Sequence, residues 1–139
     1  MSVEANKAQT MEIIKHGWNR GDMEALDTLI SPDFINHTTD NPSEGRDGFK
    51  ARVQMIRTAF PDWELDVEDM IGEGDKVVTR WRAHGTHRGR FAGIEPSGRQ
   101  IDVTGIAIDR VVDGKRVEGW VQWDMQGLLR QLTAEDGAT

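Results

Sequence analysis

The chain has 139 residues, 24 of them acidic and 17 basic, which gives a formal net charge of -7, and 37% of its residues are hydrophobic. This length suits one domain with a single core, and the apolar fraction excludes a disordered or fibrous chain. The negative net charge has the wrong sign for holding a phosphate backbone, so we expect no nucleic-acid partner.

Apolar residues recur at helical spacing in three parts of the N-terminal half. They do so from Met11 to Trp18, from Ala25 to Ile30 and from Phe49 to Phe60, which predicts three helices. Asp22 can cap the second helix. A short extended piece and a loop over residues 38–45, rich in Asn, Pro, Ser and Gly, separate the second helix from the third.

After Pro61 apolar residues alternate with polar ones, which is the pattern of half-buried antiparallel strands. Asp113-Gly114 is a strong hairpin signal, because a two-residue type I′ turn needs positive φ at both positions. Residues 85–100 form a glycine-studded excursion. The expected strands cover residues 63–67, 76–84, 101–112 and 115–124. This order predicts an α+β fold, with the helices packed on one face of a curved antiparallel sheet and a cavity between them.

The sequence has no cysteine, which excludes disulfides, zinc–thiolate sites and thiol nucleophiles and fits a reducing compartment. Residues 1–8 are polar and lack the apolar run of a signal peptide. Nowhere do about eighteen apolar residues follow one another, as a membrane-spanning helix would need. We therefore expect a cytoplasmic protein without a membrane partner, formed by a single domain over residues 1–139.

Asp124 is the first candidate for acid–base chemistry. It ends the aromatic and apolar run 119–124, in which strand alternation places Trp120, Gln122 and Asp124 on one face. Burial beside tryptophans raises the pKa of a carboxyl toward neutrality, which suits a general acid or base. The alternative is that Asp124 caps the helix that follows it.

In the expected strand 76–84, every second residue from position 80 has a basic side chain. Arg80, Arg82 and His84 share one strand face, and Trp81 lies on the other. A face turned inward could hold a carboxylate or an enolate oxygen. Composition favours the alternative, a solvated outer face, because Trp81 is the better core residue.

Arg110 poses a similar question on the next strand. Ile106 and Ile108 flank it in period two and are typical core residues. An arginine on an apolar stripe needs an anion, so we expect it to pair with Asp124 across the hairpin.

Further residues are candidates for binding a substrate. His37 follows a short extended piece and could reach the mouth of a pocket, although a surface histidine is the alternative. Trp63 and Trp120 could line an aromatic ligand site, or simply fill the core. His84 and His87 point to opposite faces of a strand, so we expect no metal site. The chain also lacks the glycine-rich loops of nucleotide sites and the serine elbow of hydrolases.

Together these pieces resemble the SnoaL-like polyketide cyclases along almost the whole chain. The segments that carry the resemblance are Trp18-Asn19-Arg20-Gly21-Asp22, Ala59-Phe60-Pro61-Asp62, Gly85-Thr86-His87-Arg88-Gly89, Asp113-Gly114-Lys115 and Trp120 through Asp124 with Gly127-Leu128-Leu129. The resemblance implies a cone-shaped barrel of the nuclear-transport-factor type, with three N-terminal helices on a strongly curved antiparallel sheet.

The resemblance also implies cofactor-independent aldol ring closure of a small hydrophobic or aromatic carbonyl compound. The aspartate that takes a proton in this family maps onto Asp124, and Arg110 stands where founding members have a histidine. Arginine can stabilise an oxyanion but does not readily shuttle a proton. The working hypothesis is that Asp124 acts as the acid–base group, with Arg110 and Arg82 near the developing charge.

Other functions remain open at this point. The fold also hosts limonene epoxide hydrolases, which use an Asp–Arg–Asp arrangement, and Arg80 and Arg82 lie on the strand that supplies the arginine there. A non-catalytic domain that binds an apolar metabolite, or a dimeric scaffold, is the alternative from another class. Sheet faces of this fold often pair subunits, so we expect a homodimer.

Overall fold

The computed structural model describes residues 2–38 and 44–134. Helices fill most of the N-terminal half and strands most of the C-terminal half, as the sequence predicts. The elements are α1 (Val3–Ile13), a π-helical turn (Ile14–Trp18), α2 (Met23–Leu29), β1 (Ile30–Asn36), α3 (Gly45–Ala59), β2 (Glu64–Glu73), β3 (Lys76–Thr86), β4 (Gln100–Val112), β5 (Lys115–Trp123) and α4 (Met125–Thr133). None of the described helices is long and apolar enough to cross a membrane.

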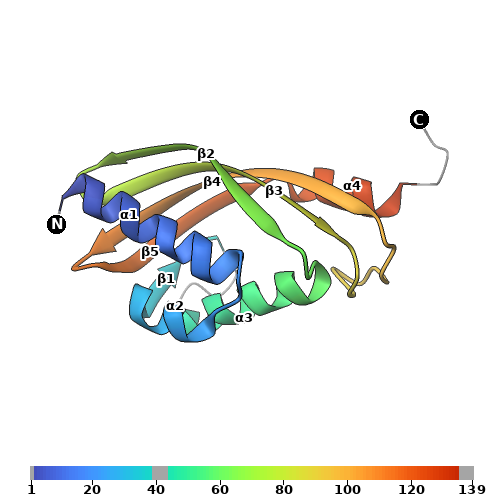
Figure 1. Ribbon diagram of the computed structural model, residues 1–139, viewed down its shortest axis with the longest axis horizontal. Coiled ribbons are helices and arrows are strands. Elements are labelled where there is room, and N and C mark those ends of the chain that lie inside the picture. Colours follow the sequence, from blue (N-terminus) through green and yellow to red (C-terminus); the bar gives the residue numbers. More distant parts are fainter. Residues whose placement is uncertain (1, 39–43, 135–139) are drawn as a thin grey trace.

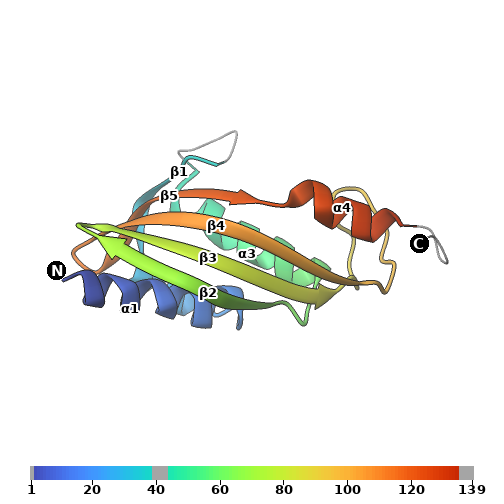
Figure 2. The same cartoon turned by 90° about the horizontal axis from the view of Figure 1, so that it is seen from above.

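The strands form one sheet in the order β1-β5-β4-β3-β2. Neighbours from β5 to β2 are antiparallel, whereas β1 pairs with β5 in parallel. The sheet curves over α1, α2 and α3, which lie on its concave side (Figure 1). Figure 2 shows β5 to β2 side by side, with α3 behind them and α4 at the far end. The predicted α+β fold is confirmed, and the curved sheet is not closed into a complete barrel.

The first helix differs in detail from its prediction. Met11, expected among its core residues, has 42% of its surface exposed, whereas Ile13 and Ile14 are both buried. The buried side of α1 is partly polar, with Asn6 and Thr10 almost fully enclosed. Asn6, Thr10 and Ile13 recur at regular helical spacing, and the search for apolar residues misses this face because two of the three are polar.

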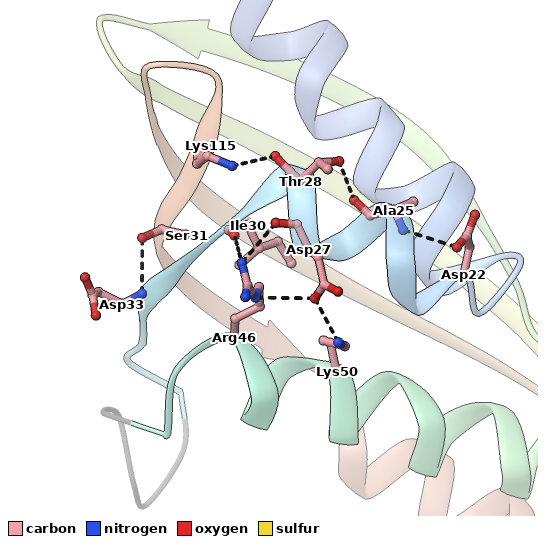
Figure 3. A network of polar contacts seen from close by, with 10 residues as sticks. All are labelled: Asp22, Ala25, Asp27, Thr28, Ile30, Ser31, Asp33, Arg46, Lys50 and Lys115. Atoms are coloured by element: carbon pink, nitrogen blue, oxygen red, sulfur yellow. Dashed lines mark hydrogen bonds and ion pairs between the residues drawn. The ribbon is translucent and has the colours of Figure 1, made fainter.

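Polar contacts tie α2 and β1 to α3 and to the β4–β5 hairpin (Figure 3). The ammonium group of Lys50 donates to Asp27 over 2.8 Å, and a guanidinium nitrogen of Arg46 donates to the Asp27 carbonyl over 2.9 Å. The hydrogen bond from Lys50 lowers the pKa of Asp27. Lys115 from the hairpin donates to the Thr28 carbonyl over 2.9 Å. These contacts fix α3 against the concave face of the sheet.

The glycine-studded excursion of residues 87–99 is anchored by a buried histidine. The Nδ1 atom of His87 accepts the backbone N–H of Ser97 over 3.1 Å and lies 2.8 Å from the Ser97 hydroxyl. The backbone N–H groups of Arg88 and Gly89 donate to the carbonyl of Ala59, at the end of α3. The excursion therefore closes the end of the sheet over the C-terminus of α3.

Gly105 is a steric requirement of the core. It pairs with Trp81 on β3 and with Trp123 on β5, whose rings lie 6.4 Å apart. A methyl group at Gly105 would overlap the Trp81 ring. The absence of a side chain therefore lets the Trp81 indole lie across β4 toward Trp123.

We expect Gly105→Ala to lower the free energy of unfolding by about 1–3 kcal/mol, because the added methyl overpacks the Trp81 site. Urea denaturation followed by tryptophan fluorescence measures the change. Thr104→Ala, one residue earlier on the exposed face of the same strand, is the control and should change stability much less. A Gly105→Ala protein as stable as the control would contradict this account of the packing.

Candidate active site

A cavity of about 160 Å³ lies between the helices and the concave face of the sheet. Its walls are mostly apolar, and four tryptophans contribute to them. These are Trp18, Trp63, Trp81 and Trp123. Rigid aromatic walls of this kind suit a flat hydrophobic molecule. The cavity expected from a sheet curved over helices is thus present.

A carboxylate and a guanidinium lie together in this apolar wall. Asp109 on β4 and Arg116 on β5 both line the cavity and are 6% and 5% exposed. The Nη2 atom of Arg116 lies 2.7 Å from Oδ1 of Asp109. The contact is an ion pair rather than a well-aligned hydrogen bond, since Oδ1 of Asp109 has no hydrogen-bond partner among the described residues. The Nε atom of Arg116 likewise has no hydrogen-bond partner among the described residues.

The position of Arg116 depends on an irregularity in β5. Arg110 pairs with Glu118, but the next residue of β4, Val111, pairs with Arg116, so Val117 is an extra residue. This bulge turns Arg116 to the concave face, together with Gly119. The guanidinium carbon then lies 4.7 Å from the centre of the Phe34 ring, a cation–π contact that holds the group in place.

Gly119 lets the arginine reach its partner. Gly119 pairs directly with Asp109, and a methyl group at this position would overlap the Arg116 guanidinium. The guanidinium therefore runs against bare backbone to reach the carboxylate. Any larger residue at this position would displace it.

Burial sets the protonation behaviour of Asp109. Removal of the carboxyl from water raises its pKa above the ordinary value, and the charge of Arg116 opposes the rise without cancelling it. A carboxylic acid with a higher pKa has a more basic carboxylate. Asp109 is thus chemically suited to take a proton from a weak carbon acid.

The structure places the two residues predicted to be catalytic outside this cavity. Asp124 is exposed and caps α4, where its Oδ1 atom accepts the backbone N–H of Gly127 over 2.9 Å. Arg110 points to the outer face of the sheet and pairs with Asp75 over 2.8 Å and with Glu118 over 3.5 Å. The predicted pairing of Arg110 with Asp124 is wrong, because the register places Arg110 beside Glu118, whereas Asp124 follows the opposite end of β5.

The two arginines and the histidine predicted on β3 also lie on the outer face. Arg80 pairs with Asp69 on the neighbouring strand β2, and Arg82 with Glu68 and with Asp102 on β4. His84 Nε2 lies 3.8 Å from an Asp66 oxygen, and all three side chains are exposed. Their prediction as substrate-binding residues is not supported by the cavity, since Thr79 and Trp81 of this strand line it instead.

The remaining predicted residues are divided between the two faces. Trp63 lines the cavity, as expected of a binding residue. The His37 ring stacks on Trp120 with centroids 4.6 Å apart, and Gln122 is exposed on the same outer face. At the cavity itself the neighbours of His37, Asn36 and Thr38, contribute instead.

One signal in the sequence could have identified Asp109. Val103, Gly105, Ala107 and Asp109 lie in period two on β4, so a carboxylate stands on an apolar stripe. The competing stripe of Ile106 and Ile108 looks more hydrophobic, which led the prediction to Arg110. No spacing rule could have found Arg116, because the bulge changes its face.

No cluster of three His, Asp or Glu side chains able to hold a metal ion occurs in the described ranges. His87 is completely buried and faces Ser97, whereas His84 is exposed. The two histidines therefore do not converge.

The raised pKa of Asp109 predicts a pH-dependent stability. Because the folded protein holds this proton more tightly than the unfolded chain, the associated stabilisation is present at low pH and lost as pH rises from about 3.8 through the folded pKa. Asp109→Asn has no such proton. The unfolding free energy of the wild type relative to this variant should therefore fall with rising pH in urea titrations. A flat or rising difference would contradict the assigned direction.

Comparisons with known proteins agree with this architecture. The family model of the SnoaL-like polyketide cyclases matches residues 8–132. Nogalonic acid methyl ester cyclase from Streptomyces nogalater is 32% identical over 119 residues, which cover 83% of this chain and 88% of that enzyme.

Two solved structures show the same fold over most of their length. AclR from Streptomyces galilaeus, described as a hydroxylase, has a TM-score of 0.86 at 32% identity, covering 99% of this chain and 87% of its own. IdmH from Streptomyces antibioticus, described as a polyketide cyclase, has a TM-score of 0.81 at 33% identity, covering 91% of this chain and 97% of its own. The similarity in sequence and the curved sheet over three helices lead to one assignment: the chain belongs to the SnoaL-like polyketide cyclase family.

Proposed function

We propose that this protein is a cofactor-independent cyclase that closes a ring in an aromatic or hydrophobic carbonyl compound, with Asp109 as its acid–base group. The observation that carries the proposal is the buried Asp109–Arg116 pair in an otherwise apolar cavity. Family membership supports the reaction class, since a relative with 32% identity is a methyl ester cyclase. Fold alone would not be sufficient, because one fold can host many functions.

The proposed reaction is an intramolecular aldol addition. The Asp109 carboxylate takes a proton from the carbon next to a carbonyl group, and the electrons of that C–H bond form an enolate. Arg116 stabilises the negative charge on the enolate oxygen. The enolate carbon then forms a bond to a second carbonyl carbon of the same molecule, whose oxygen receives the proton back from Asp109. No proton or electron is gained or lost overall.

The apolar walls contribute in two ways. They exclude water, which strengthens the interaction of Arg116 with the developing charge. They also hold a flat molecule with its two reacting carbons close together. The conformational entropy that ring closure costs is then lost on binding and no longer adds to the barrier. Trp81 on β3 and Trp123 on β5 are two of the four tryptophans that provide flat walls for this purpose.

Two variants distinguish this proposal from the sequence-based prediction that Asp124 is the acid–base residue. With nogalonic acid methyl ester as substrate, we expect Asp109→Asn to lower kcat by roughly 10²–10⁴-fold. Asp124→Asn should keep its activity, because asparagine is as good a helix cap as aspartate. The opposite result, an inactive Asp124→Asn and an active Asp109→Asn, would assign the acid–base role to Asp124. Circular dichroism and thermal melts of both variants control for folding.

The alternatives make different demands on the site. Epoxide hydrolysis by an Asp–Arg–Asp arrangement needs a second carboxylate, and among the described residues that line the cavity Asp109 is the one acid. Incorporation of labelled water into a diol would nevertheless identify it. A non-catalytic binding domain would bind the ester tightly and leave it unchanged, with the wild type and Asp109→Asn behaving alike.

We also propose that two copies pair through the outer face of the sheet. Ile71, Val78, Ile108 and Trp120 are successive cross-strand partners and form an apolar row across four strands. Ile71 is 65% exposed, and Ile106 beside the row is 49% exposed. An exposed apolar row of this kind is typical of an interaction surface. The cytoplasmic location and the independence from cofactors stay predictions.

Sedimentation velocity tests the pairing. The wild type should sediment as a dimer at micromolar concentration, and Ile106→Asp should shift it to the monomer, because a charge would be buried in the apolar contact. Met11→Asp is the matched control, since Met11 is similarly exposed but lies on α1 at the opposite side of the sheet. A monomeric wild type would contradict the proposal.

A further inference from the structure

Thr79 has a buried hydroxyl group that the fold does not use. The side chain lies on the concave face of β3, lines the cavity and is 2% exposed. Its Oγ1 atom has no hydrogen-bond partner among the described residues. A buried polar atom without a partner lowers stability, and native proteins contain few of them. Valine has nearly the same shape and would avoid this cost.

A second threonine in the same cavity provides the contrast. Thr10 on α1 lines the cavity and is 1% exposed, but its hydroxyl donates to the carbonyl of Asn6 over 3.0 Å. Its polar group therefore has a structural partner, whereas that of Thr79 is free to bind a guest. The two residues differ in this respect although their burial is the same.

The strand register places Thr79 beside the proposed acid–base group. Thr79 pairs with Ala107, and Val77, two residues earlier on the same strand, pairs with Asp109. Thr79 and Asp109 are therefore diagonal neighbours on the concave face, with backbones roughly 7–8 Å apart. Arg116 approaches Asp109 from β5, on the opposite side. Asp109 thus lies between a cation on one neighbouring strand and a free hydroxyl on the other.

We propose that the Thr79 hydroxyl donates a hydrogen bond to an oxygen of the bound substrate, next to the carbon that Asp109 deprotonates. The ligand it selects is an aromatic compound with a keto or phenolic oxygen at that position. In turnover this bond strengthens as negative charge develops on the oxygen. The catalytic part of the inference rests on the proposed function, whereas the oxygen-binding part does not.

The binding test uses two probes of the same shape, 2-naphthol and naphthalene, measured by equilibrium dialysis. The wild type should bind 2-naphthol roughly tenfold more tightly than naphthalene, as one net hydrogen bond allows. Thr79→Val should bring this ratio close to one, Thr10→Val should keep it, and Thr79→Ser should largely restore it. An unchanged ratio in Thr79→Val, or no preference in the wild type, would overturn the proposal.

The melting temperature distinguishes a binding role of the Thr79 hydroxyl from a structural one. Because the hydroxyl has no partner in the fold, Thr79→Val should melt at the same temperature as the wild type or higher. A clear decrease would show that the hydroxyl has a structural partner and would contradict the inference. Thr79→Ala, which also lacks the hydroxyl, repeats the binding test should valine disturb the packing.

The outcome is independent of the cyclase assignment. If Asp109→Asn remains active, the proposed function fails while the naphthol ratio still reports on Thr79. If the ratio is insensitive to Thr79 while Asp109→Asn is inactive, only this inference fails. With an ester that is turned over, Thr79→Val should lower kcat about tenfold or more and change KM little, because the hydrogen bond is strongest in the transition state.

Discussion

The buried ion pair between Asp109 and Arg116 is the constraint on which the candidate active site depends. A carboxylate and a guanidinium removed from water need each other, because either charge alone in this apolar wall would be strongly destabilising. Their contact at 2.7 Å requires the bulge at Val117, which turns Arg116 inward, and the bare backbone at Gly119, which lets it pass. Two local features of β5, the bulge and the glycine, thus serve a single interaction.

The curved sheet separates two kinds of chemistry. On the concave face polar groups are few and enclosed, and the one carboxyl among the described cavity residues has its pKa raised by burial. On the outer face Arg80 and Arg82 are matched by carboxylates of neighbouring strands, and Arg110 by Asp75 in the β2–β3 turn and Glu118 on β5. Water screens these outer pairs, so they contribute little to stability or to chemistry. The same residue types therefore have different roles on the two faces.

A buried polar group without a partner indicates function in this fold when it also lines the cavity. Evolution tolerates a buried, unpaired hydroxyl such as that of Thr79 only at a cost in stability. Functional sites are where such costs accumulate, because the missing partner is supplied by a ligand. The contrast between Thr79 and Thr10, two threonines in one cavity, separates the part of the wall that interacts with a guest from the part that only encloses it.

The fold class, the three N-terminal helices, the β4–β5 hairpin and the family could be predicted from sequence, because they follow from local periodicity, turn chemistry and the order of motifs along the chain. The sequence also indicated Trp63 as a cavity residue. Which of two adjacent β4 residues faces the cavity, Asp109 or Arg110, could be seen only in the folded protein. Strand alternation offers two faces one residue apart, and Asp109 or Arg110 is inside according to how β4 packs against the helices. The bulge then moved Arg116 inward, and the end of β5 before Asp124 left that residue to cap α4.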